Sequence, residues 1–162
     1  MRKIQVPLAS YSLAKSPDVL ASYGVGSCVV VALFDPGTRL AAMAHVMLPG
    51  RGEEKRDLPP AMYSDQAIEA MLEDLIRCGS VRERLVAKIA GGAQMFVFPL
   101  ISKDHSQSPG RRNVETVIKK LSREAIPLVA KDVGKNHGRS IEFYPESGQM
   151  LIRTLSEGIK EI

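Results

Sequence analysis

The sequence predicts an α+β protein with largely antiparallel, sandwich-like β-sheets and two main helices packed outside. Three observations predict this class. Candidate strands come in adjacent pairs rather than in alternation with helices, two segments show the apolar spacing of helices, and turn sequences join the paired strands. The chain has 162 residues, 44% of them hydrophobic, which is enough for one cored domain spanning residues 1–162.

Two hairpins are predicted from turn chemistry. The first joins strands at 28–34 and 39–48 through the sequence DPGT, where Pro36 and Gly37 suit the central positions of a type II turn. The second joins the last two strands through PESG. The later strands are expected at residues 84–92, 127–133, 140–144 and 149–155.

Two amphipathic helices are predicted from apolar residues at helical spacing. The first is expected at about 65–77, where Ser64 can cap its start and Gly79 can end it. The second is expected at about 114–125, with Asn113 as its capping residue. Both helices have ordinary polar outer faces, so they are expected to cover a sheet.

Composition excludes several classes of function. The net charge of +4 is spread along the chain, and a chain without Trp lacks the aromatic platforms typical of nucleic-acid binding. No apolar stretch of 18 residues predicts a membrane span, and the three histidines show no metal-ligand spacing. We therefore expect a cytoplasmic monomer with free thiols, without a metal or a cofactor.

Cys28 begins the first predicted hairpin within the stretch YGVGSCVVVALFDPG. A two- or four-residue loop around DPGT would place Cys28 directly opposite His45 on one face of the sheet. Opposed Cβ atoms in antiparallel strands lie about 4.5–5.5 Å apart, so the thiol and the imidazole could meet. A bulged loop of three or five residues would instead shift the pairing by one residue and remove this alignment.

A thiolate beside an imidazolium is the activated form of cysteine, and such a pair lowers the pKa of the thiol. Backbone N–H groups near Gly26, Ser27 and Cys28 are the first candidates for an oxyanion hole, and those of Gly91 and Gly92 are the second. The competing interpretation is structural, because a cysteine that begins an apolar strand is commonly a core residue. His45 is then a half-buried histidine without a catalytic role.

These motifs carry a family resemblance. The sequence SYGVGSCV, followed by FDP and AHVMLP, resembles the signature of the CheD-type chemoreceptor glutamine deamidases. The resemblance continues through AKIAGGAQMF at 87–96, GRRNVETV at 110–117 and the C-terminal segment at 131–155. It covers nearly the whole chain in the same order.

The resemblance implies hydrolysis of glutamine side-chain amides on the cytoplasmic helices of methyl-accepting chemoreceptors, without a cofactor. By position, the catalytic cysteine of the family falls on Cys28 and its histidine on His45. The third catalytic group, a threonine hydroxyl in the family, falls on Ser22. Serine keeps the hydroxyl that can orient the imidazole, but it lacks the methyl group that restricts χ1.

Two alternatives to this enzyme remain open from the sequence. Relatives of the family also bind a CheC-type phosphatase that acts on the response regulator, so the chain could be a regulatory adaptor with little turnover. The same cysteine and histidine could also serve another cysteine hydrolase or an acyltransferase.

Overall fold

The computed structural model describes residues 1–50, 59–95 and 108–162. These residues form two sheets of five strands each and two α-helices, α1 (Ser64–Arg77) and α2 (Pro109–Arg123). The strands are β1 (Lys3–Gln5), β2 (Ser10–Lys15), β3 (Val19–Val25), β4 (Val29–Asp35), β5 (Leu40–Val46), β6 (Val86–Gly91), β7 (Leu128–Val133), β8 (Arg139–Tyr144), β9 (Gln149–Thr154) and β10 (Gly158–Glu161). Two single-turn 3₁₀ helices lie at Pro60–Met62 and Arg82–Arg84.

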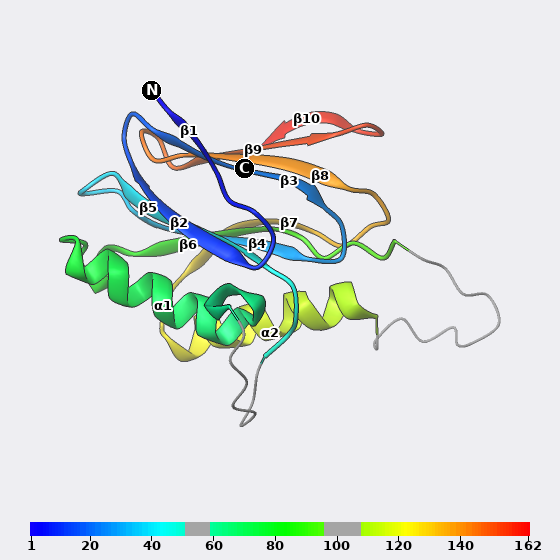
Figure 1. The fold of residues 1–162 in the computed structure, drawn as a ribbon, viewed down its shortest axis with the longest axis horizontal. Helices are drawn as coiled ribbons and strands as arrows, with labels where there is room; N and C mark the ends of the chain where they lie inside the picture. The colour runs from blue at the N-terminus through cyan, green and yellow to red at the C-terminus, as the bar shows by residue number, and fades with distance from the viewer. Residues whose placement is uncertain (51–58, 96–107) are drawn as a thin grey trace.

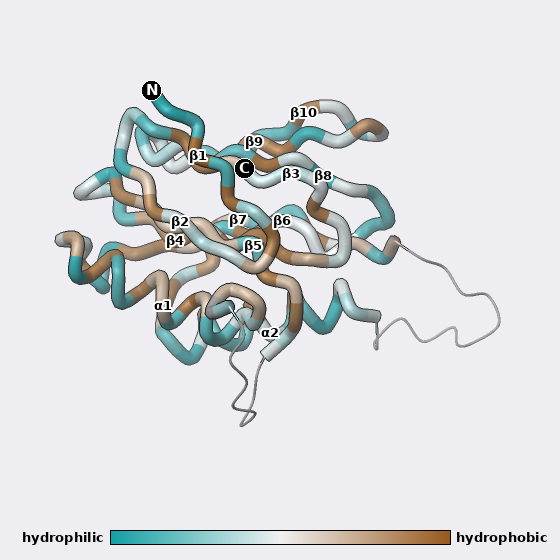
Figure 2. The backbone as a smooth tube through the Cα atoms, viewed as in Figure 1, coloured by the Kyte–Doolittle hydropathy of each residue, from teal (hydrophilic) through white to brown (hydrophobic). Residues whose placement is uncertain are grey.

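The elements stack in three layers (Figure 1). The first sheet has the order β1-β3-β8-β9-β10, and the second has the order β2-β5-β4-β6-β7. One apolar core fills the space between the sheets, and another lies between the second sheet and the two helices. The middle layer is therefore buried on both faces, which explains why β4 and β5 read as continuous apolar runs. Figure 2 shows alternating hydrophilic and hydrophobic colours along α1 and α2, as expected for helices that cover a sheet.

The predicted fold class is confirmed. Neighbouring strands are antiparallel except for the parallel pairs β1/β3 and β6/β7. Both helices pack on the outer face of the second sheet, and the two sheets face each other as in a sandwich. Strands β1, β2, β3 and β10 were not predicted. Strands β1, β2 and β10 are short or half-polar and give a weak apolar signal, whereas β3 is a mostly buried strand that was missed.

The first hairpin exists, but its turn differs from the prediction. Four residues separate the paired ends Asp35 and Leu40, and the left-handed residue is Arg39 (φ 54°) rather than Gly37. Gly37 instead leaves room for Arg84, because a Cβ there would meet Nε of the guanidinium at 2.6 Å and the Arg84 side chain would have to shift. The Arg84 side chain crosses this position to reach the carboxylate of Asp35.

The starts of both helices also differ from the prediction. Ser64 is the first residue of α1 rather than its cap, and its hydroxyl donates to the carbonyl of Pro49. Helix α2 begins at Pro109, five residues earlier than expected, and Ser108 caps it by accepting from the Arg111 N–H. Asn113 therefore lies inside α2. The expected end of α1 at Gly79 is confirmed by its positive φ of 103° and its hydrogen bond to the last turn.

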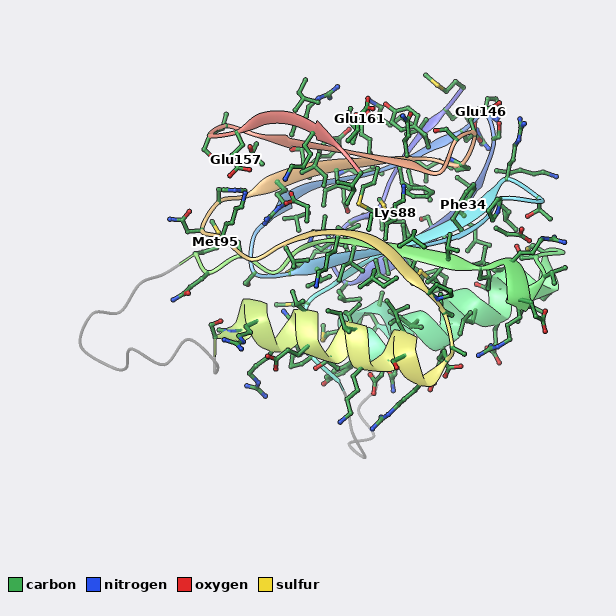
Figure 3. All side chains as sticks on the ribbon, turned by 180° about the vertical axis from the view of Figure 1, so that it is seen from behind. Phe34, Lys88, Met95, Glu146, Glu157 and Glu161 are labelled. Atoms are coloured by element: carbon green, nitrogen blue, oxygen red, sulfur yellow. The ribbon has the colours of Figure 1, made fainter. Side chains whose placement is uncertain are left out.

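The short connection from β3 to β4, residues 26–28, carries the chain from the first sheet into the second. It lies at the same end of the sandwich as the end of β6 and the start of α2 (Figure 1). Met95 marks this end, because its side chain packs over Gly26. In Figure 3, Met95 lies at the opposite end of the molecule from Phe34 and Glu146.

Candidate active site

Ser22 and His45 meet between the two sheets. Ser22 lies on β3 in the first sheet and His45 on β5 in the second, and Ser22 Oγ is 3.3 Å from Nδ1 of the imidazole. Ser22 Oγ is also 2.6 Å from the carbonyl oxygen of Val6, to which it donates its only proton. The hydroxyl must therefore accept a hydrogen bond from Nδ1–H of His45, which leaves Nε2 without a proton.

The other ring nitrogen of His45 is buried and unpartnered. The side chain is 4% exposed, and Nε2 has no hydrogen-bond partner within the described part of the chain. Burial lowers the pKa of His45 below its ordinary value, because an imidazolium would be poorly solvated there. A buried nitrogen lone pair without a partner costs about 1–3 kcal/mol, and this arrangement is well suited to a proton acceptor.

Cys28 is half-buried and directly precedes β4. Burial raises the pKa of its thiol, and this outweighs the opposite effect of its own backbone N–H. This direction is opposite to the lowered thiol pKa that the sequence led us to expect. The directions of the two pKa shifts favour a thiol and a neutral imidazole over an ion pair.

The register between β4 and β5 differs from the prediction by two residues. His45 is opposite Val30, and the last paired residues are Val29 and Val46. Cys28 therefore lies one step beyond the ladder rather than directly across from His45. Side chains alternate between the two faces of a sheet with a period of two. A shift of two residues therefore keeps position 28 on the same face as His45. In a regular pair of strands, residues at such positions are diagonal neighbours with Cα atoms about 7–8 Å apart.

The oxyanion candidates Gly26, Ser27 and Cys28 form a segment whose carbonyls all point into the fold. The Gly26 carbonyl accepts from Ala93 N–H at 2.9 Å, and the Cys28 carbonyl accepts from Gly92 N–H at 2.7 Å. The Ser27 carbonyl accepts from the side chain of Asn113. Within the described residues, no hydrogen bond between residues uses the N–H of Ser27 or Cys28.

The second pair of oxyanion candidates serves this segment instead. The Gly92 N–H donates to the Cys28 carbonyl at 2.7 Å, so in this structure it does not point to a substrate. Gly91 has φ 116°, and a Cβ at this position would overlap the Cys28 carbonyl oxygen. Gly91 therefore allows the end of β6 to approach Cys28 closely, whereas Gly92 leaves room for Val114 and Gly110 of α2.

Two buried residues near the site were not predicted. Arg139 is 2% exposed, pairs with Asp132 at 3.2 Å and donates to the carbonyl of Gly134 at 3.1 Å. The side-chain amide of Asn113 contacts the segment that carries Cys28. The Ser108-Pro109 pair, a capping residue followed by a residue favoured at the first helical position, was the signal that could have placed Asn113 inside α2.

The described residues give no sign of a metal cluster or of a membrane span. No three His, Cys, Asp or Glu side chains gather there in a metal-binding arrangement. None of the helices described is both long and apolar enough to cross a membrane.

Comparison with known proteins identifies the family. A family model described as CheD chemotactic sensory transduction matches residues 47–154. The chain belongs to the CheD family. The matched range begins two residues after His45 and so excludes both Cys28 and His45, but pairwise similarity to curated CheD proteins extends over 98% of this chain.

Three curated CheD relatives show the extent of this similarity. The probable chemoreceptor glutamine deamidase CheD of Lachnoclostridium phytofermentans is 42% identical over 98% of both chains. The protein of the same name from Geobacillus kaustophilus is 43% identical over 98% of this chain and 96% of its own. The chemoreceptor glutamine deamidase CheD of Halalkalibacterium halodurans is 42% identical over 98% of both chains.

A crystal structure of the hypothetical protein YfiH of Bacillus licheniformis overlaps this chain only in part. The TM-score is 0.42 at 16% identity, over 70% of this chain and 46% of that one. This likeness is too low to bear on fold or function.

Proposed function

We propose that this chain hydrolyses the side-chain amide of glutamine residues on methyl-accepting chemoreceptors, giving glutamate and ammonia. The observation that carries the proposal is similarity at 42% identity, over 98% of both chains, to a curated chemoreceptor glutamine deamidase. The buried, unpartnered Nε2 of His45 supports a mechanism for it, because a site of this kind can accept the proton of a thiol.

In this mechanism Cys28 is the nucleophile and His45 is the general base. Nε2 of His45 takes the thiol proton as the sulfur attacks the carboxamide carbon, and the imidazolium then gives this proton to the departing nitrogen, which leaves as ammonia. His45 next takes a proton from water, and the hydroxide attacks the thioester. Collapse of this second intermediate releases glutamate and restores the Cys28 thiol.

Ser22 and the Cys28 segment have supporting roles in this proposal. Ser22 accepts from Nδ1–H and so keeps Nε2 free to act as the base. The N–H groups of Ser27 and Cys28 are our candidates for the oxyanion hole, because the carbonyls of this segment are held inward by Gly92, Ala93 and the Asn113 side chain.

The surface around Cys28 suits a helical substrate. Met47 and Met95 are exposed apolar residues, at 41% and 44% of their surface. The Met47 carbonyl shares the Asn113 side chain with the carbonyl of Ser27, and Met95 packs over Gly26, so both residues lie close to the segment that carries Cys28. Exposed apolar side chains of this kind bind one face of an amphipathic helix, such as those of a receptor cytoplasmic domain.

We also infer that residues 1–162 act as one domain, in the cytoplasm where those receptor helices lie. Lys88 on β6 donates to the carbonyls of Gly148 and Ile162, which ties the C-terminus to the second sheet. Near the N-terminus, Lys3 pairs with Glu142 of β8. Both ends of the chain are thereby fixed to the sandwich.

Mass spectrometry of a purified receptor cytoplasmic domain tests the proposed function. The intact chain should add about one dalton per converted side chain, because an NH₂ group is exchanged for OH. Cys28→Ala and His45→Ala should give no conversion, whereas Cys78→Ser, which removes the exposed second thiol, should convert normally. Conversion by Cys28→Ala at the rate of the unmodified chain would exclude this nucleophile.

A further inference from the structure

Asn113 joins the ends of the two strands that carry the proposed catalytic residues. It lies on α2 and is 1% exposed. Its side-chain Nδ2 donates to the carbonyl of Ser27 at 3.0 Å and to the carbonyl of Met47 at 3.2 Å. Because both partners are acceptors, the NH₂ group rather than the oxygen must face them.

These two carbonyls lie next to the ends of β4 and β5. Ser27 directly precedes Cys28, and Met47 comes two residues after His45. The ladder between β4 and β5 ends at the pair Val29 and Val46, so both carbonyls lie just beyond its last pair. At this point the NH₂ group of Asn113 replaces the ladder as the link between the two strand ends.

Helix α2 holds Asn113 firmly against this end of the sheet. A Cβ at Gly110 would meet the carbonyl oxygen of Ala93 at 2.5 Å, so the first turn of α2 lies directly on the end of β6. Ala93 N–H in turn donates to the carbonyl of Gly26. The helix, the end of β6 and the segment that carries Cys28 thus form one connected unit.

The remaining polar atom of Asn113 argues against a role in stability alone. Its Oδ1 is buried and has no hydrogen-bond partner among the described residues. An unsatisfied buried acceptor is a cost to folding. The useful part of the side chain is therefore the pair of N–H groups, and both are directed at the strand ends.

We propose that Asn113 is a positioning residue that fixes the Cys28 thiol relative to the imidazole of His45. This inference rests on the proposed function for its effect on turnover, but not for its effect on the thiol itself. Without the NH₂ link, the end of β4 can move away from the end of β5. The approach of sulfur to Nε2 is then less well defined, and proton transfer is less frequent.

The test compares Asn113→Ala and Asn113→Asp with Val117→Ala in a Cys78→Ser background, where Cys28 is the only thiol. Asp keeps the shape of Asn but cannot donate to the carbonyls. Val117 is buried on α2 against the sheet, so its truncation weakens the same helix without touching Ser27 or Met47. Each variant is measured for kcat and KM on a receptor cytoplasmic domain, for thermal unfolding, and for alkylation of Cys28 by iodoacetamide across pH without receptor.

Both Asn113 variants should lose roughly ten- to a hundredfold in kcat, the scale expected for misplaced reacting groups, with KM changed by less than about threefold. Their alkylation profiles should resemble that of His45→Ala, because the imidazole no longer assists the thiol. Val117→Ala should unfold at a lower temperature yet keep kcat within about twofold and the unmodified alkylation profile.

Other results separate this inference from the proposed function. If both Asn113 variants keep kcat and the alkylation profile while Cys28→Ala and His45→Ala are inactive, the positioning role is wrong and the function stands. If Val117→Ala loses as much kcat as they do, Asn113 acts only through stability. If Cys28→Ala still deamidates the receptor, the proposed mechanism fails, and the alkylation profiles alone decide whether Asn113 positions the thiol.

Discussion

Ser22 Oγ lies 3.3 Å from Nδ1 of His45 and 2.6 Å from the carbonyl of Val6, so one hydroxyl links the two sheets at the proposed site. The Val6 carbonyl takes the only proton of this hydroxyl, and the imidazole must supply the proton for the second bond. The first sheet therefore selects the tautomer of a histidine that belongs to the second sheet.

Ser22→Ala should lower kcat by roughly ten- to a hundredfold while the protein stays folded, because it removes a neutral positioning hydrogen bond. Nitrogen NMR of labelled His45 should show a larger fraction of the tautomer that carries its proton on Nε2. Ser22→Thr, which keeps the hydroxyl, is the matched control and should keep the original tautomer. An unchanged tautomer ratio in Ser22→Ala would show that Ser22 does not orient the ring.

The pKa shifts predict the pH dependence of the reaction. Burial lowers the pKa of His45, so the imidazole stays neutral and able to accept a proton down to below about pH 6.5, its ordinary value. We expect kcat/KM to be flat through neutral pH and to fall only as the pH drops through this lowered pKa. Activity that is already lost at pH 6.5 would contradict a buried, neutral base.

The thiol should titrate on the other side of neutrality. Burial raises the pKa of Cys28, so alkylation by iodoacetamide in a Cys78→Ser background should rise with a midpoint above about 8.5. The midpoint of a small reference thiol in the same buffer provides the comparison. A midpoint below the reference would instead indicate a resting ion pair with His45.

The hydrophobic pattern was sufficient to predict the fold class and most of the elements. Strands β4 to β9 and both helices give strong periodic or continuous apolar signals, because each faces at least one of the two cores. Strand β2 is half-buried at the edge of its sheet, and β10 is exposed along its length. Their sequences have little apolar pattern, so only tertiary pairing reveals them.

The structure brings Ser22 and His45 together, but the geometry of the first hairpin differs from the prediction. Cys28 and His45 were predicted to lie directly opposite each other, but the turn places its left-handed residue at Arg39 and moves the register by two. Local sequence favoured Gly37 for the left-handed position, but in the structure Gly37 lies against the side chain of Arg84, which is distant in sequence. The function of Asn113 depends on two carbonyls that are 86 and 66 residues away in sequence, which no local pattern can show.

Gly91→Ala should damage the site more than an equivalent change elsewhere. Gly91 has φ 116°, and an added Cβ would overlap the carbonyl oxygen of Cys28. Gly79→Ala is the matched control, because its φ is 103° but an added Cβ would meet no atom within 4 Å. In both variants alanine has to adopt a positive φ, and this backbone strain costs about 1 kcal/mol or more. Only Gly91→Ala should also lower kcat on the receptor domain, and equal losses in the two variants would exclude a specific contact with Cys28.

Asp35 fixes the turn that sets the register of the catalytic hairpin. Its carboxylate is fully buried and accepts from Arg84 through two nitrogens, at 2.8 and 2.9 Å, and from the N–H groups of Gly37 and Val81. The Arg84 guanidinium holds the pKa of this carboxyl well below its ordinary value, and the two N–H groups add to the effect. The charged form is therefore much better stabilised in the folded chain than in the unfolded one.

Asp35→Asn should lower the free energy of unfolding at pH 7 by about 2–3 kcal/mol, because buried donors lose a charged acceptor. A carboxyl with a lowered pKa contributes stability that is fully present above its unfolded pKa of about 3.9 and is lost as pH falls toward its folded pKa. Urea unfolding at pH 7 and at pH 3 should therefore show a smaller difference between the two proteins at the lower pH. Asp18→Asn, which breaks the exposed pair with Arg2, should change stability much less at pH 7. A gap between Asp35→Asn and the unmodified chain that is the same at both pH values would mean that the Asp35 charge does not hold this turn.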